Sequence, residues 1–253
     1  LYLRTLRKEV GTMKPRLVFY ITSLEGGGAE RVFLNLIQGF IKRGFTDIWL
    51  ILNKAKGLFL SYLPHLVHIV DLKEPEIPFH IYHLPYYMTQ KHTNSFWLDS
   101  IIKVNFLALK VTDFLRRKNL RTILHLFLIS IKLIDQINKI RPNILLSGLT
   151  NCNLIAMLAH LFTNNYKMII SEHSTPSLSI RFQSTPGIIL WMMRHLYPQA
   201  NKIIAVSRGV ADDLINLLNL PNEKIETIYN PVVTSDLFVK ARQTISHPWF
   251  EQN

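Results

Sequence analysis

Residues 17–43 read LVFYITSLEGGGAERVFLNLIQGFIKR, and three local patterns follow one another within them. Leu17 to Thr22 is a short, apolar, β-branched run, which is typical of a strand that is buried on both faces. Three consecutive glycines come next. From Ala29 to Arg43 apolar residues recur at helical spacing, and Gly44 follows as a C-terminal cap. The stretch therefore predicts a strand, a tight turn and an amphipathic helix.

The same alternation of short apolar runs and helical patterns continues along the chain. Further strands are expected at 47–52, 67–72, 143–147, 167–171, 202–206 and 225–229, and further helices at 122–140, 151–162, 186–196 and 210–218. A strand followed by a helix and another strand forms a right-handed parallel crossover. Repetition of this unit predicts an α/β fold, namely a doubly wound, Rossmann-like parallel sheet.

The domain organisation follows from where this alternation starts, breaks and stops. We expect residues 1–13 to be a disordered extension, 14–238 to form one Rossmann-like domain, and 239–253 to begin an interdomain linker. An insertion at about 74–119 contains prolines, an aromatic and histidine-rich stretch and then a basic amphipathic helix. No stretch reaches the roughly 18 uninterrupted apolar residues that a membrane-spanning helix needs.

Composition bounds the class of protein. The chain has 253 residues, of which 48% are hydrophobic and 18% charged, so it can bury a core and is not globally disordered. A single cysteine, Cys152, excludes an internal disulfide and fits a reducing, cytoplasmic compartment. We interpret Cys152 as a small residue near a helix start. The alternative, a nucleophile, is not supported by any neighbouring histidine or acid pattern.

The formal net charge of +12 favours anionic partners. Acidic lipid and phosphorylated small molecules fit this excess, and peripheral contact with the anionic inner face of a membrane is one expectation. The alternative is a solvated basic surface without a partner. No nucleic-acid-binding motif accompanies the charge, so we expect no nucleic-acid partner.

Polar residues gather where the predicted strands end, and ligands bind beyond these ends in open parallel sheets. Candidates for substrate contact at this rim are Glu30, Arg31, Asn151 and Glu172, and His173 is the candidate for chemistry. Because successive side chains of a strand point to opposite faces, Glu172 and His173 are not expected to act as a pair.

The glycine turn at Gly26, Gly27 and Gly28 exposes backbone amides at a helix N-terminus, which is a natural anion site. Its spacing matches neither the dinucleotide fingerprint nor a Walker loop. A tight turn without a ligand remains the alternative.

A metal site is not expected. His80, His83 and His92 are close in sequence, but their spacing matches no familiar site and no cysteine or acid completes one. The aromatic residues around them suit a loop that faces a membrane or an acceptor, and a local hydrophobic cluster is the alternative.

Several motifs, in this order, resemble glycosyltransferases of family 4, which have the GT-B fold. The motifs are SLEGGGAER at 23–31, SEHS at 171–174, AVSRGVADDL at 205–214, IYNPV at 228–232 and HPWF at 247–250. The resemblance covers about residues 14–250, except for the insertion at roughly 74–119.

The resemblance implies a retaining transfer of a sugar from a nucleotide diphosphate to an acceptor, without an obligatory metal or other cofactor. By position in the motifs, Gly27 and Gly28 approach the donor diphosphate, and His173 contacts the transferred sugar or its phosphate. Ser207 and Arg208 line the cleft. This half of the GT-B fold mainly holds the acceptor, which would be a glycan or a lipid-linked glycan of polysaccharide, lipopolysaccharide or glycolipid synthesis.

The sequence departs from the family where a second Rossmann-like domain is expected. In the family that domain binds the nucleotide and carries a basic pair and a Glu-x₇-Glu pattern, whereas this sequence ends at Asn253. Without it most stabilisation of the leaving diphosphate is missing. We therefore expect no transfer by this chain alone, and a separate donor-domain chain as a partner. The alternative function is a non-catalytic, membrane-associated binding or scaffold module.

Overall fold

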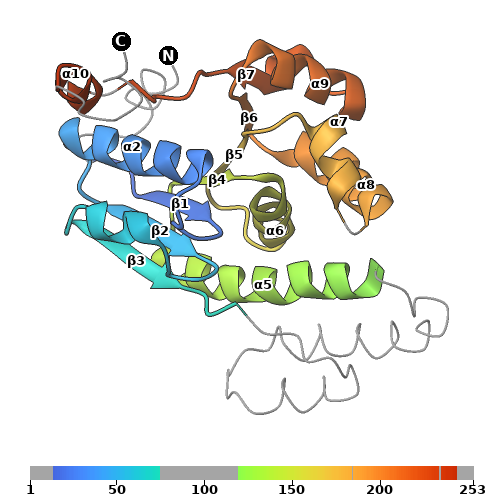
Figure 1. Ribbon diagram of the computed structural model, residues 1–253. Coiled ribbons are helices and arrows are strands. Elements are labelled where there is room, and N and C mark those ends of the chain that lie inside the picture. The colour runs from blue at the N-terminus through green and yellow to red at the C-terminus, as the bar shows by residue number, and fades with distance from the viewer. Residues whose placement is uncertain (1–13, 75–118, 184, 234, 244–253) are drawn as a thin grey trace, which may run out of the picture.

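The structure is a computed structural model, and it describes residues 14–74, 119–183, 185–233 and 235–243. Its centre is a seven-stranded sheet with the strand order β3-β2-β1-β4-β5-β6-β7 (Figure 1). The strands are β1 (Leu17–Ile21), β2 (Ile48–Leu52), β3 (Val67–Asp71), β4 (Ile144–Gly148), β5 (Lys167–Glu172), β6 (Lys202–Ala205) and β7 (Ile225–Thr227). Every neighbouring pair is parallel, so the predicted doubly wound parallel sheet is confirmed.

Helices cover both faces of this sheet. The α-helices are α2 (Gly28–Lys42), α5 (Asn119–Ile140), α6 (Thr150–His160), α7 (Pro176–Ser179), α8 (Pro186–Leu196), α9 (Arg208–Leu218) and α10 (Ser235–Ala241). The 3₁₀ turns are η1 (Leu58–Tyr62), η3 (Ile180–Phe182), η4 (Tyr197–Gln199) and η5 (Asn222–Lys224). One face packs against α2 and η1. The other face packs against α5, α6, α8 and α9.

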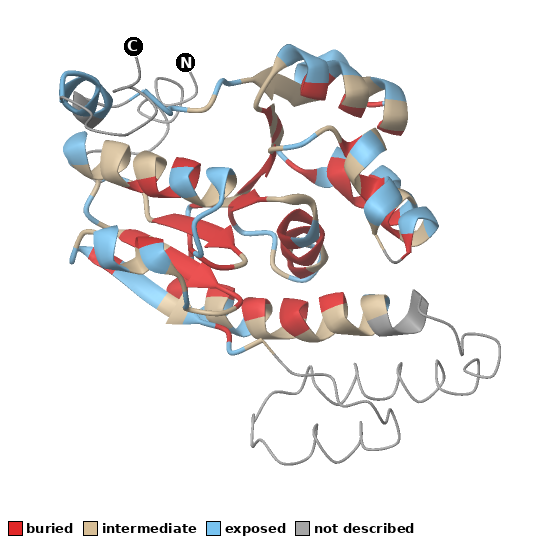
Figure 2. Ribbon diagram, viewed as in Figure 1, coloured by how far each residue is buried: buried red, intermediate tan, exposed pale blue. Residues whose placement is uncertain are grey.

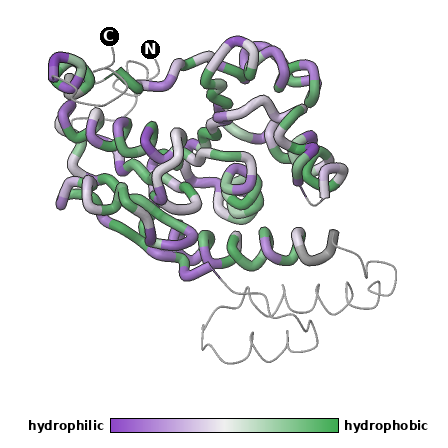
Figure 3. Tube along the Cα trace, viewed as in Figure 1, coloured by the Kyte–Doolittle hydropathy of each residue, from purple (hydrophilic) through white to green (hydrophobic). Residues whose placement is uncertain are grey.

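The core explains why β1 is apolar throughout. All five residues of β1 are buried, because helices lie on both sides of it. Helix α6 packs against the sheet and against α5, so residues around most of its circumference are buried (Figure 2). Figure 3 shows the corresponding concentration of hydrophobic residues along the central strands and α6. Strand β3 lies at the sheet edge, and most of its residues are exposed or partly exposed there.

The expected elements are present, with shifts of a few residues at their ends. Gly44 has a φ of +79°, and its amide donates to the Ile41 carbonyl at 2.7 Å, so its predicted role at the end of α2 is confirmed. Two short helices were not predicted. Helix α7 begins at Pro176 in a stretch expected to be a loop, and α10 crosses the expected domain boundary at residue 238.

Other expectations lie outside the described residues, among them most of the linker expected at 239–253 with the HPWF motif at 247–250. The extension at 1–13, the helix expected inside the insertion, and the histidines at 80, 83 and 92 also lie outside them.

Candidate functional site

The carboxyl ends of the parallel strands form one rim of the sheet. Strands β1 and β4 are neighbours there, and from this pair the strand order runs outward in both directions. Such a switch point is where ligands bind in doubly wound sheets. The glycine turn follows β1, Asn151 follows β4, His173 follows β5 and Ser207 follows β6. The fold therefore brings the predicted site residues to the same edge.

The amides of the glycine turn are partly occupied by a side chain of the same helix. Glu30 Oε2 accepts hydrogen bonds from the amides of Gly26 at 2.5 Å and Gly27 at 2.7 Å. Its other oxygen, Oε1, accepts from the Ser23 hydroxyl at 3.3 Å. A carboxylate is favoured at a helix N-terminus by the helix dipole. The Gly27 amide, which was predicted to contact the donor diphosphate, is thus hydrogen-bonded to Glu30.

Open space nevertheless remains in front of the turn. A Cβ atom placed on Gly26 or Gly28 would meet no other heavy atom within 4 Å. Gly28 is the first residue of α2, and the first amides of a helix have no partner within the helix. The predicted approach of an anion to Gly28 is therefore sterically open.

Gly57, which the sequence reasoning missed, fixes the shape of the glycine turn from the β2 side. It has a φ of +122°, and a Cβ there would lie 2.0 Å from the Leu24 carbonyl oxygen. Two backbone hydrogen bonds keep Leu24 close to Gly57. The Leu24 amide donates to Lys56 O, and the Phe59 amide donates to Leu24 O. Close backbone packing thus requires glycine at position 57.

Arg31 is turned toward η1. Its guanidinium carbon lies 4.1 Å from the centroid of the Phe59 ring and 6.0 Å from that of Tyr62. This cation–π contact orients an exposed side chain along the η1 side of α2. Its predicted contact with substrate would have to occur on that side.

His173 lies where β5 meets the first half of α2. The imidazole ring is 6.1 Å from the Phe33 ring, centroid to centroid, and its Nε2 is 3.1 Å from the Ser171 hydroxyl oxygen. Gly148, at the end of β4, makes room for both rings. A Cβ there would lie 2.4 Å from Phe33 Cε2 and 3.4 Å from His173 Nε2. The histidine and the helix that carries the glycine turn are therefore in contact.

Burial controls the charge of this histidine. It lowers the pKa of His173 to about 4, so the imidazole is neutral near pH 7. The Nδ1 atom is buried and has no hydrogen-bond partner among the described residues. A neutral ring can donate from one nitrogen and accept at the other, so it suits hydrogen bonding to a sugar hydroxyl.

Glu172 points to the opposite face of β5, as its position next to His173 predicted. Its side chain is fully buried, and it accepts hydrogen bonds from Thr150 Oγ1 at 3.0 Å, Asn153 Nδ2 at 3.0 Å and the Tyr197 hydroxyl. Burial is the main cause that raises the pKa of this carboxyl. Glu172 therefore joins α6 and η4 to β5, and the predicted contact with substrate does not fit this geometry.

The remaining predicted residues begin helices α6 and α9, on either side of His173. Asn151 is exposed in the first turn of α6. Ser207 caps α9, because its hydroxyl oxygen accepts from the Val210 amide at 3.2 Å. Arg208 is exposed as the first residue of α9. Asn151 and Arg208 thus remain accessible at the rim, while the Ser207 hydroxyl is engaged in the cap.

Cys152 is a core residue of α6, as interpreted from the sequence. Its side chain is fully buried, and burial raises the pKa of the thiol to about 12. Its Sγ lies 3.1 Å from Thr22 Oγ1. A nucleophile must form the thiolate, which this environment disfavours.

Two absences among the described residues bear on the class of site. Within these residues, no group of three or more His, Cys, Asp and Glu residues is arranged to hold a metal ion. None of the described helices has the length and hydropathy needed to cross a membrane.

Comparison with known proteins decides the family. Residues 26–236, which are most of the chain and include the whole rim from the glycine turn to Arg208, match the sequence family described as Glycosyltransferase Family 4. The chain belongs to glycosyltransferase family 4. The resemblance inferred from the motifs is therefore confirmed.

The relatives that this family 4 chain matches are longer than the chain itself. The N-acetylgalactosamine-N,N'-diacetylbacillosaminyl-diphospho-undecaprenol 4-alpha-N-acetylgalactosaminyltransferase of Campylobacter jejuni is 26% identical over 235 residues, which are 91% of this chain and 52% of the relative. A solved glycosyltransferase from Rickettsia africae has a TM-score of 0.54 at 14% identity, covering 92% of this chain and 47% of that one. The lipopolysaccharide outer core galactosyltransferase WaaB, in its apo form, has a TM-score of 0.50 at 14% identity, covering 85% and 46%. The chain spans about half the length of these relatives.

Some residues that build the family 4 rim were not predicted from the sequence. Phe33 was assigned only to the apolar stripe of α2. Gly148 was expected at the rim, directly after the strand at 143–147, but its close contacts with Phe33 and His173 were not predicted. Gly57 and Tyr197 were not singled out. The available signals were Gly148 at the end of a strand, Gly57 in a loop and Tyr197 directly after a helix. None of these reveals which distant residue it contacts.

Proposed function

We propose that this family 4 chain is the acceptor-side half of a retaining glycosyltransferase, which transfers a sugar from a nucleotide diphosphate to a glycan or lipid-linked acceptor. The observation that carries the proposal is the contact of His173 with Phe33 of α2, beside Gly148. Through this contact the histidine and the glycine turn line one rim at the switch point of the sheet.

The proposed roles follow from the chemistry of these groups. The amides at the start of α2 bind a phosphate oxygen of the donor, with Gly28 as the open position. Neutral His173 hydrogen-bonds the transferred sugar or its phosphate, since burial lowers its pKa to about 4. Asn151 and Arg208 contact substrate from the starts of α6 and α9. We propose that the reaction needs no metal ion.

Transfer also requires positive charge near the leaving diphosphate. At this rim Lys54 and Lys56 are paired with Glu74 and Glu25, at 3.6 Å and 2.5 Å, and Arg31 stacks on an aromatic ring. Lys56 and Arg31 are therefore engaged by other groups and Lys54 is only loosely paired, so Arg208 at the start of α9 is the exposed cation that remains among the predicted site residues. We therefore propose that a nucleotide-binding half supplies the charge, and that residues 1–253 alone do not transfer sugar.

The class of acceptor is proposed from the relative and from the charge. The Campylobacter relative is named for a diphospho-undecaprenol substrate, which is a lipid-linked glycan. A net charge of +12 favours the anionic inner face of a membrane, where such a lipid would be reached. We propose a role in polysaccharide, lipopolysaccharide or glycolipid assembly at that surface.

A fusion tests the proposal. The part of the Campylobacter relative that this chain does not match is joined after Phe250, and transfer of N-acetylgalactosamine from its nucleotide diphosphate to the relative's lipid-linked acceptor is measured. We expect transfer by the fusion and none by the chain alone, with the whole relative as the positive control. A folded fusion that neither transfers nor hydrolyses the donor, while still binding anionic vesicles, would instead favour a non-catalytic binding module.

A further inference from the structure

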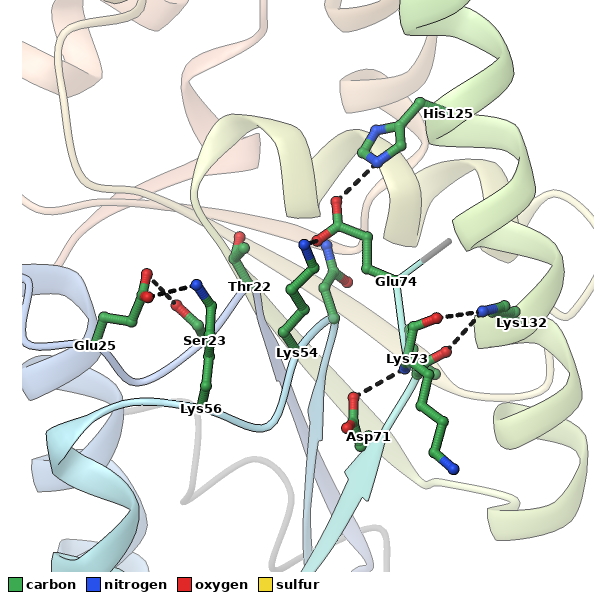
Figure 4. Close-up of polar contacts among 12 residues, drawn as sticks. Thr22, Ser23, Glu25, Lys54, Lys56, Asp71, Lys73, Glu74, His125 and Lys132 are labelled. Carbon is green, nitrogen blue, oxygen red and sulfur yellow. Dashed lines mark hydrogen bonds and ion pairs between the residues drawn. The ribbon is translucent and has the colours of Figure 1, made fainter. Parts of the chain in front are cut away.

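A second polar cluster lies on the same rim, on the β2 and β3 side (Figure 4). The Glu74 cluster consists of Asn53 and Lys54, which follow β2, Glu74, which follows β3, and His125 on α5. Strand β1 and its glycine turn separate this cluster from β4 and β5, which carry Gly148 and His173. The roles proposed above for transfer do not use it for binding.

Glu74 is a largely buried carboxylate held in a fixed position. Its side chain is 16% exposed, and Oε1 lies 2.7 Å from His125 Nε2. The second oxygen, Oε2, lies 3.6 Å from Lys54 Nζ, which is longer than a close charge-assisted hydrogen bond. The Lys54 side chain is 44% exposed, so its ammonium keeps donors available for a further partner.

Asn53 supplies a second preorganised group beside it. The residue is 3% exposed, and its Oδ1 accepts a hydrogen bond from the Tyr20 hydroxyl at 2.5 Å. Glu74 and Asn53 are linked directly, because the Glu74 amide donates to the Asn53 carbonyl at 2.9 Å. The Asn53 side-chain nitrogen forms no hydrogen bond with another described residue, which makes it a candidate donor to a ligand beside Glu74.

The charge of the cluster selects the class of ligand. One carboxylate faces one ammonium and one imidazole, so the charges largely cancel, and a phosphate here would meet the negative charge of Glu74. A sugar hydroxyl both donates and accepts. It can donate to the Glu74 carboxylate while accepting from Lys54 or from Asn53.

We propose that the Glu74 cluster is the subsite that binds hydroxyl groups of the acceptor's sugar. This inference rests on the proposed function, since it assigns the acceptor to the β2 and β3 side and leaves the donor to the glycine turn and His173. An ion-pair network that only fixes the end of β3 would affect stability, but it would not affect sugar binding.

Binding of simple sugars to the full chain tests the subsite. The probes are the methyl glycosides of N-acetylgalactosamine, galactose and glucose, measured by saturation-transfer NMR, together with inorganic pyrophosphate. We expect at least one glycoside to bind in the millimolar range, and Glu74→Gln to weaken it about tenfold, as loss of one hydrogen bond to a charged group predicts. Lys54→Met is a second variant at a more exposed position and should weaken the same glycoside.

Asp135→Asn is the matched control, because Asp135 forms an exposed carboxylate–lysine pair with Lys139 at 2.6 Å on the same helix, α5. It should leave glycoside binding unchanged. The proposal is overturned if no glycoside binds, if Glu74→Gln and Lys54→Met behave like Asp135→Asn, or if pyrophosphate binds in place of the glycosides.

The fusion assay separates this inference from the proposed function. If the fusion carrying Glu74→Gln transfers sugar with an unchanged KM for the acceptor, the subsite assignment is wrong and the proposed reaction stands. If the fusion transfers no sugar but binds a glycoside, and this binding depends on Glu74, the subsite assignment stands and the proposed reaction is wrong.

Discussion

Gly148→Ala should disturb both the core and the histidine. The added Cβ would lie 2.4 Å from Phe33 Cε2 and 2.6 Å from Cζ, so the ring must withdraw until these contacts exceed about 3.0 Å. Phe33 is fully buried and has no free space to enter. Overpacking of this kind costs about 1–3 kcal/mol. For a chain of this length that corresponds to a fall in Tm of roughly 3–10 °C.

The same movement should be visible at His173, because its ring contacts Phe33. Displacement of either ring admits water, so the pKa of His173 should rise from about 4 toward its ordinary value. Thermal unfolding gives the stability, and NMR titration of the imidazole C–H signals gives the pKa. The double variant Gly148→Ala with Phe33→Leu should recover part of the lost stability.

Gly187→Ala is the control for this substitution. A Cβ on Gly187 meets no other atom within 4 Å, and the residue lies in the first turn of α8, so alanine there should be neutral or stabilising. A Gly148→Ala protein with the Tm of the unmodified protein and an unshifted His173 titration would show that the Phe33, Gly148 and His173 contact is wrong.

Three further predictions concern the same rim. The contribution of His173 to stability should fall as the pH drops below 6.5 and level off below about 4, because in this range the unfolded chain binds a proton at His173 and the native protein does not. This contribution is about 3 kcal/mol, and His173→Asn should abolish it in urea titrations at pH 7 and pH 4.5. Gly57→Ala should cost at least about 2 kcal/mol in denaturant unfolding, through its positive φ and its overlap with the Leu24 carbonyl, and an unshifted midpoint would contradict the close packing. Glu30→Ala should destabilise the protein by about 1 kcal/mol by removing the carboxylate that caps α2, and unchanged stability would show that the cap contributes nothing.

The sheet could be predicted because its signals are local. The run of residues 17–22, the glycines after it and the periodic stripe of α2 lie next to one another in the sequence, and each has one favoured conformation. Strand alternation also placed His173 and Glu172 on opposite faces before their contacts were known.

Most contacts within the rim could not be predicted, because they join residues that are far apart in the chain. Nothing near Glu172 in the sequence indicates that Tyr197 and Asn153 bury its carboxyl. The partners of the Glu172 carboxyl depend on which side chains the tertiary packing places next to it. The contact of Glu30 with the Gly26 and Gly27 amides is local instead, and a glutamate at the third position of the helix is the sequence signal that could have predicted it.

The most direct test of the central claim is the rate of sugar transfer by the fusion with and without His173. His160 provides the control, since it is also partly buried with a lowered pKa but lies at the last residue of α6, away from the rim. We expect His173→Ala to reduce kcat by at least about a hundredfold, the lower end for loss of a positioned catalytic hydrogen-bonding group, while His160→Ala retains most activity. Equal activity of the two variants, both folded, would contradict the assignment of this rim as the site of transfer.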